Sequence, residues 1–320
     1  MIVTVTTNPG IDRTYRVPEL QLGEVNRARG EHAEASGKGV NVTRVLHAAE
    51  ARTCALLTSG GVEGRHLTAL LEQEGIACRA VAVSEPTRTN INILDSEGCT
   101  TKVNGPGSPL STEDSSSLLA ELDSLAVQAS WVVCSGSLPV GTDPTLQRDL
   151  IETARARGAK VAVDASGAAL NAAVEAKPDL VTPNSFELAE LVGRDLPDLS
   201  AVREAAREIS ATIEGQVLVS MGSEGALCVS GPRAWLATPA PIEPVSTAGA
   251  GDALLAGWLF EDQRQESAAD IAACLARGVA WGTAACRLAE TAGNVAPLAD
   301  PGAVTIHILP EVSTAATTQL

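Results

Sequence analysis

The sequence predicts an α/β fold in which helices cover both faces of a mostly parallel sheet. Short apolar, strand-like runs alternate with helical patterns along the chain, as expected of right-handed βαβ units. The 320 residues, 45% of them hydrophobic, suffice for a large core. Two further strand-like segments break the alternation and predict a small projecting β-sheet.

The elements follow one another in a regular order. We expect strands at residues 2–6, 54–59, 131–134, 160–164, 180–182 and 217–221. We expect helices at residues 40–49, 64–74, 112–125, 144–157, 185–192 and 202–213. Ligands of such folds bind beyond the carboxyl ends of the strands.

The projecting sheet is predicted from residues 14–17 and from a hairpin of residues 89–94 and 100–103, in which Asn90 and Asn92 alternate with isoleucines. It draws on about residues 12–36 and 87–106, and it could form a lid over a site or a dimer contact. One domain is expected over residues 1–312, followed by a loose tail at 313–320.

Composition excludes several functions. The net charge of −16 argues against binding to nucleic acid or to an anionic membrane surface. The seven cysteines have no metal-like spacing and are expected to be reduced thiols. The first residues predict a buried strand and no apolar run reaches the length of a membrane span, so we expect a cytoplasmic protein.

The segment STAGAGDALLAG, residues 246–257, carries most of the functional information. The small residues Gly249, Ala250 and Gly251 lead into Asp252 and an apolar helix, so successive backbone N–H groups can hold an anion. An aspartate beside that anion makes sense as a general base that deprotonates a hydroxyl before it attacks a phosphoryl group. This is the chemistry of a kinase. The alternative is a glycine-rich turn in which Asp252 caps a core helix.

A second anion site is predicted at ASGKGVNVTRVL, residues 35–46. Lys38 stands between Gly37 and Gly39 at the expected start of a helix, where its charge adds to that of free N–H groups. The alternative is a lysine that is only solvated.

Six blocks of the chain together resemble the PfkB (ribokinase-like) carbohydrate kinases. They are ASGKGVNVTRVL, CSGSLPVG, VDASG, TPNSFEL, VSMGSEGA and STAGAGDALLAG, in the family's order. The resemblance implies a ribokinase-like fold and a kinase that handles phosphate with its GAGD turn, because the chain has no GxxxxGK[ST] loop.

Residues 23–42 and 87–107 are most similar to the family's fructose-1-phosphate kinases. A phosphorylated substrate requires cations, which Arg27, Lys38 and Arg88 would supply. Asp12 and Asn41 match the family's contacts to sugar hydroxyls. The implied substrate-binding residues are Asp12, Arg27, Gly37, Lys38, Gly39, Asn41 and Arg88.

The resemblance assigns ATP to the second half of the chain. Glu187 matches a glutamate that acts on the magnesium of Mg-ATP, through water. Thr182 stands where relatives commonly carry lysine, which removes one phosphate contact. Some relatives also hold a monovalent cation near the positions of Ser246 and Ala248. The implied nucleotide-binding residues are Asn184, Ser220, Gly222, Gly225 and Gly251.

The implied reaction is ATP-dependent phosphorylation of fructose 1-phosphate at its C6 hydroxyl, which yields fructose 1,6-bisphosphate. Asp252 would be the base, and the amides of Gly249, Ala250 and Gly251 would hold the transferring group. Two alternatives stay open. One is a related kinase for tagatose 6-phosphate or fructose 6-phosphate; the other is a non-catalytic sugar-phosphate sensor.

Overall fold

The structure is a computed structural model that describes residues 1–265, 270–288 and 291–310. The chain divides into two compact units, Met1–Lys160 and Val161–Leu320. The single domain expected over residues 1–312 stays a prediction, and the tail expected at 313–320 lies outside the described residues.

The first unit is built on four parallel strands. Their order is β8-β1-β4-β5, and they span Trp131–Ser135, Ile2–Thr6, Thr53–Ser59 and Cys78–Ala82. All of β1 and most of β4 are buried, as expected where helices cover both faces of a parallel sheet. The covering helices are α1 (Lys38–Ala48), α2 (Gly61–Gln73), α3 (Thr112–Ala126) and α4 (Thr145–Ala156).

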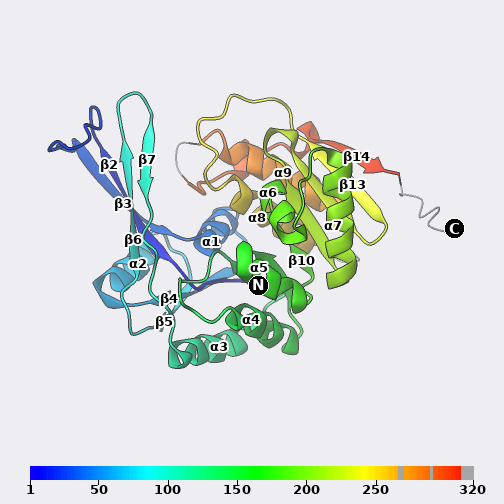
Figure 1. Ribbon diagram of the computed structural model, residues 1–320, viewed down its shortest axis with the longest axis horizontal. Coiled ribbons are helices and arrows are strands. Elements are labelled where there is room, and N and C mark those ends of the chain that lie inside the picture. Colours follow the sequence, from blue (N-terminus) through cyan, green and yellow to red (C-terminus); the bar gives the residue numbers. More distant parts are fainter. Residues whose placement is uncertain (266–269, 289–290, 311–320) are drawn as a thin grey trace. The chain divides into compact units, whose positions relative to one another are not determined.

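A second sheet of the first unit projects from this core (Figure 1). Its order is β3-β2-β6-β7, with bounds Gly30–Ser36, Gly10–Arg16, Arg88–Leu94 and Thr100–Val103. We call it the lid sheet. Ile11 and Ala35 at its base are buried in one cluster with Leu57, Leu67 and Leu71 of β4 and α2. Hydrophobic burial therefore anchors the base of the lid sheet.

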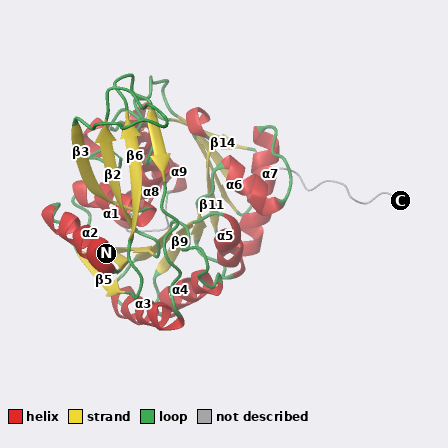
Figure 2. Ribbon diagram, turned by 60° about the vertical axis from the view of Figure 1, so that its left-hand side comes forward, coloured by secondary structure: helices red, strands yellow, loops and turns green. Residues whose placement is uncertain are grey.

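The second unit has six strands in the order β14-β13-β12-β11-β10-β9. They span Thr305–Leu309, Arg233–Thr238, Ala226–Ser230, Gln216–Ser220, Leu180–Val181 and Lys160–Asp164. The last three are parallel, whereas β12, β13 and β14 pair antiparallel. The helices are α5 (Gly167–Glu175), α6 (Ser185–Val192), α7 (Leu199–Ile213), α8 (Ala250–Arg264) and α9 (Ile271–Ala285). Figure 2 distinguishes these helices from the strands by colour.

The predicted fold class is confirmed, and several elements have the expected bounds, including β1, β7, β9 and α6. Strand β2 begins at Gly10 rather than at Thr14, and β12 to β14 were not predicted. No α-helix separates β11, β12 and β13, and β14 comes only after two successive helices, α8 and α9, so a regular alternation of strand and helix does not reveal these strands. Among the described residues, no helix has both the length and the apolar character needed to cross a membrane.

Candidate active site

The turn that holds Lys38 begins α1 in an unusual way. Gly37 is the N-cap residue at φ 136°, no side chain caps the helix, and the first turn carries no acidic residue. A helix N-terminus favours negative charge, so a lysine at this position is unfavourable by itself. It becomes favourable when an anion binds beside both the lysine and the free N–H groups. The turn also packs closely on β1: a Cβ at Gly39 would lie 2.3 Å from Thr6 Oγ1. Neither glycine could carry a side chain without moving the turn.

Asp12 and Arg88 lie near each other on the lid sheet. Arg88 begins β6 and is the register partner of Gly10, two residues before Asp12 in β2. Arg88 Nη1 donates to the carbonyl oxygen of Gly105 at 3.0 Å, while its buried Nε has no hydrogen-bond partner among the described residues. Burial lowers the pKa of Arg88, and the charge of Asp12 opposes this. An orphaned guanidinium N–H fits an incoming phosphate oxygen.

Asn41 is held by a residue that the sequence did not single out. Arg44 Nη1 donates to Asn41 Oδ1 at 3.4 Å, and Arg44 Nη2 donates to the carbonyl oxygen of Ala35 at 2.9 Å. The same guanidinium makes a two-pronged ion pair with Glu74, at 2.6 and 3.0 Å. Arg44 thus joins α1, β3 and the end of α2. Its spacing of three residues from Asn41 was the only sequence signal.

A second carboxylate accompanies Asp12. Glu34 of β3 is the register partner of Asp12. Burial raises the pKa of Glu34; the positive charge of Arg44 opposes this, and the negative charge of Asp12 adds to it. At the base of the lid sheet, Glu34 therefore has Asp12, Glu74 and Arg44 as charged neighbours.

Arg27 lies apart from the other predicted substrate residues. It is exposed in the loop between β2 and β3. That loop enters β3 at Gly30, whereas the Lys38 turn follows the opposite end of β3. Six residues of extended strand measure about 20 Å, so within one chain Arg27 is not brought to Lys38.

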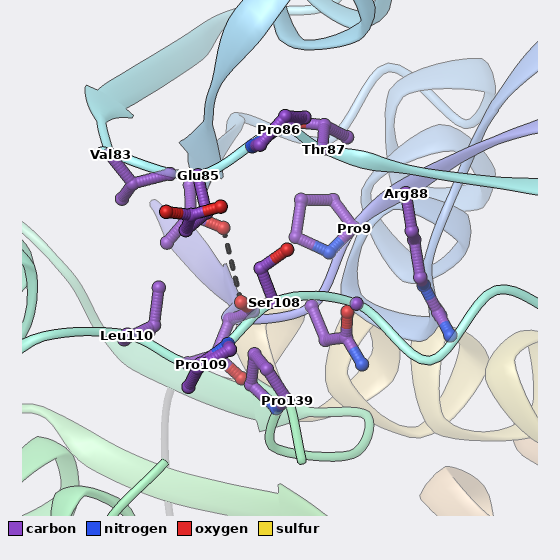
Figure 3. Close-up of a pocket in the computed structure, with 14 residues that line it drawn as sticks. Pro9, Val83, Glu85, Pro86, Thr87, Arg88, Ser108, Pro109, Leu110 and Pro139 are labelled. Atoms are coloured by element: carbon purple, nitrogen blue, oxygen red, sulfur yellow. Dashed lines mark hydrogen bonds between the residues drawn. The ribbon is translucent and has the colours of Figure 1, made fainter. Parts of the chain in front are cut away.

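A pocket of about 300 Å³, part of it open to solvent, lies beside Arg88 (Figure 3). Arg88 and Pro9 line one side of it, and Val83, Glu85 and Leu110 line the other. Of the predicted substrate residues only Arg88 lines this pocket. The pocket therefore borders the candidate sugar site at its arginine.

The GAGD turn begins α8 in the second unit. Gly249 is the N-cap residue in the left-handed region, at φ 77°, and Asp252 lies in the first turn and is 6% exposed. The N–H of Ala250 makes a long hydrogen bond, 3.4 Å, to the carbonyl oxygen of Thr247. A Cβ built at Gly251 would meet no atom within 4 Å. Open space thus adjoins Gly251 in the first turn of the helix.

Replacement of Gly249 by alanine should lower stability. Its left-handed backbone disfavours a side chain, and the new Cβ would lie 3.0 Å from Thr291 Cγ2 and 3.2 Å from the backbone nitrogen of Ala292. We expect a loss of about 1–3 kcal/mol in the free energy of unfolding, measured by urea denaturation. Gly251→Ala is the matched control and should keep wild-type stability. Equal stability of the two variants would contradict the prediction.

The predicted nucleotide residues gather at the ends of β10 and β11. Asn184 and Glu187 form a capping box at α6: Asn184 Oδ1 accepts from the Glu187 N–H at 2.8 Å, and Glu187 Oε2 accepts from the Asn184 N–H at 2.9 Å. Asn184 also bridges to Ser220, which ends β11. Gly222 follows in a short 3-10 turn. The carboxyl edge of these strands therefore carries Asn184, Ser220 and Gly222 together.

Gly225 has a structural role in this turn, since a Cβ there would lie 1.9 Å from the carbonyl oxygen of Ala237. Thr182 donates to the carbonyl oxygen of Val163 at 3.3 Å. Among the described residues, no cluster of three or more His, Cys, Asp or Glu side chains could hold a metal ion. A single carboxylate such as Glu187 fits magnesium that arrives with phosphate and water ligands.

The fold and these motifs define a carbohydrate kinase of the ribokinase-like class. The model of the pfkB family carbohydrate kinases matches residues 3–297. The chain therefore belongs to this family, which confirms the expectation from the six blocks.

Individual relatives and solved structures are also similar to this chain. The chain is 38% identical to a 1-phosphofructokinase of Rhodobacter capsulatus, over 80% of this chain and 82% of that protein. It is similar to the crystal structure of phosphofructokinase-2 from Escherichia coli in complex with potassium, with TM-score 0.85 and 31% identity, over 92% of this chain and 94% of that one. Ribokinase of Arabidopsis thaliana shares the fold, with TM-score 0.72 and 20% identity, over 92% of this chain and 96% of that chain.

Proposed function

We propose that the protein transfers the γ-phosphoryl group of Mg-ATP to the C6 hydroxyl of fructose 1-phosphate, which yields fructose 1,6-bisphosphate and ADP. Arg88 carries this proposal: it is a half-buried guanidinium beside Asp12 with one N–H unpaired among the described residues, as a substrate that already bears a phosphate requires. The 38% identity to a 1-phosphofructokinase supports the same acceptor.

The residues of the first unit bind the sugar phosphate in this proposal. Arg88, Lys38 and the amides beside Gly37 and Gly39 bind its phosphate, with Arg27 as a further cation. Asp12 and Asn41 hydrogen-bond its hydroxyl groups. The lid sheet limits the access of water, which would otherwise compete as acceptor.

The residues of the second unit act on ATP and on the transferred group. Asp252 takes the proton of the C6 hydroxyl while the hydroxyl oxygen bonds to the γ-phosphorus and the bond to ADP breaks. The N–H groups of Gly249, Ala250 and Gly251 stabilise the negative charge on the transferring group. Asn184, Ser220, Gly222 and Gly225 form the nucleotide edge. Magnesium, held by ATP and through water by Glu187, would neutralise phosphate charge.

A monovalent cation near Ser246 and Ala248 is part of the proposal. The N–H of Ala248 donates to Ser246 Oγ at 3.2 Å, and the N–H of Val245 donates to the carbonyl oxygen of Cys286 at 2.8 Å. These bonds fix the loop before the GAGD turn. The structure of phosphofructokinase-2 from Escherichia coli in complex with potassium supports a role for a monovalent cation.

Two wider properties complete the proposal. The exposed pair Ile91 and Val103, register partners in β6 and β7, supports a homodimer through the lid sheets. All seven cysteines are unpaired thiols, which supports a reducing, cytoplasmic location.

The test is a coupled ADP-release assay with Mg-ATP that compares kcat/KM for four acceptors. These are fructose 1-phosphate, fructose 6-phosphate, tagatose 6-phosphate and fructose. We expect fructose 1-phosphate to dominate. Dominance of a 6-phosphate would assign the related kinase reaction instead, and the absence of turnover with all four would favour the sensor.

A further inference from the structure

Asn90 occupies a central position in the lid sheet that the proposed reaction does not yet use. It lies in β6 as the register partner of Asp12 and is 7% exposed. Its Nδ2 donates to Asp12 Oδ1 at 2.6 Å, and its Oδ1 accepts from the Gly105 N–H at 3.1 Å. A carboxylate can only accept and a backbone N–H can only donate, so these two partners determine the orientation of the amide.

Gly105 extends this connection to Arg88. The carbonyl oxygen of Gly105 accepts from Arg88 Nη1 at 3.0 Å. The segment runs close along β6, since a Cβ at Gly105 would lie 2.8 Å from the carbonyl oxygen of Thr89. One buried amide therefore joins the Asp12 carboxylate to the backbone that holds the Arg88 guanidinium.

We infer that Asn90 is a positioning residue for the sugar phosphate: it orients Asp12 toward a sugar hydroxyl and, through Gly105, orients Arg88 toward the phosphate. This inference rests on the proposed function, which assigns both groups to the substrate. A hydrogen bond to a carboxylate is short and strong when it is sheltered from water. Asp12 thus keeps one oxygen on Asn90 and presents the other to the substrate.

The variant Asn90→Asp tests the inference by a pH dependence. The new carboxylate keeps the shape of the side chain and can still accept from Gly105, but it can no longer donate to Asp12 unless it is protonated. Two facing carboxylates repel when both are ionised and share one proton as the pH falls. With the sugar phosphate that the wild type uses best, we expect KM to rise about 10- to 100-fold at pH 8. The rise should shrink toward pH 6, while KM for ATP is unchanged.

The matched control is Asn92→Asp. Asn92 lies on the same strand and the same face, is 9% exposed, and is the register partner of Thr14 instead of Asp12. It should keep the wild-type pH profile. A double variant separates positioning from simple repulsion of the substrate: in an Asp12→Asn background the pH effect of Asn90→Asp should disappear, because a neutral amide at position 12 can donate to the new carboxylate.

The outcomes are distinct. If Asn90→Asp folds, as judged by circular dichroism, and has the wild-type KM or the profile of Asn92→Asp, the inference is wrong and the proposed function stands. If it does not fold, Asn90→Ser replaces it, because the shorter hydroxyl cannot reach Asp12; an unchanged KM for the sugar phosphate would then overturn the inference. If the wild type turns over no sugar phosphate, the proposed function fails and the inference falls with it.

Discussion

Replacement of Asp252 by asparagine should reduce kcat for phosphoryl transfer by about 10²- to 10⁴-fold, the usual contribution of a general base. Asp252 is 6% exposed in the first turn of α8, directly after the amides proposed to hold the transferring phosphoryl group. An amide of the same size cannot accept the proton of the attacking hydroxyl. The two KM values should change little, because shape and packing are retained.

The measurement is steady-state turnover with Mg-ATP and fructose 1-phosphate, combined with calorimetric titration of ADP. ADP should bind the variant as it binds the wild type. Asp262→Asn, which makes the same chemical change further along α8, is the control and should retain turnover. A near-normal kcat for Asp252→Asn would eliminate the assignment of the base.

Replacement of Arg88 by methionine should raise KM for fructose 1-phosphate by about 10- to 100-fold, as expected for loss of a charged hydrogen-bond partner. Methionine retains an unbranched apolar stem, which should preserve the packing against Gly10, where a Cβ would lie 3.0 Å from Arg88 Cγ. KM for ATP should not change. Arg88→Lys should give an intermediate effect, because lysine keeps the charge but loses the planar fork.

The measurement for Arg88 is the ratio of kcat/KM for fructose 1-phosphate to that for unphosphorylated fructose. This ratio should collapse in Arg88→Met. Arg79→Met in β5 is the control, since its ion pair with Glu121 at 3.7 Å is solvent-exposed and such pairs contribute little. An equal loss with both acceptors would show that Arg88 supports only the structure of the lid sheet.

Some interpretations of the sequence were not exclusive. The family resemblance assigned Asn184 and Glu187 to the nucleotide site, and the structure shows that they form the capping box of α6. In this box Glu187 Oε2 accepts a hydrogen bond from the Asn184 N–H. The role of Glu187 toward magnesium stays a prediction. The N-cap residue of α8 is Gly249 and not Asp252, and the role of Asp252 as the base stays a prediction.

Local motifs could be predicted because their chemistry lies within one turn. The residues 249–252 and 37–39 are contiguous, so their glycines and the start of the following helix determine where the N–H groups point. The alternation of apolar strands and helices likewise determined the fold class, since the period of each segment is a property of that segment alone.

What the tertiary structure alone decided is the pairing of distant segments. Asp12 meets Asn90 across 78 residues of sequence, and Arg44 meets Glu74 across 30. A shift of one residue in the register of β2 and β6 would turn Asn90 to the other face of the sheet. The sequence of neither strand by itself specifies that register. The sequence by itself therefore determined the kind of chemistry at each turn. Burial of Ile11 and Ala35 against α2 and β4, which anchors the lid sheet, decided which side chains share the proposed sugar site.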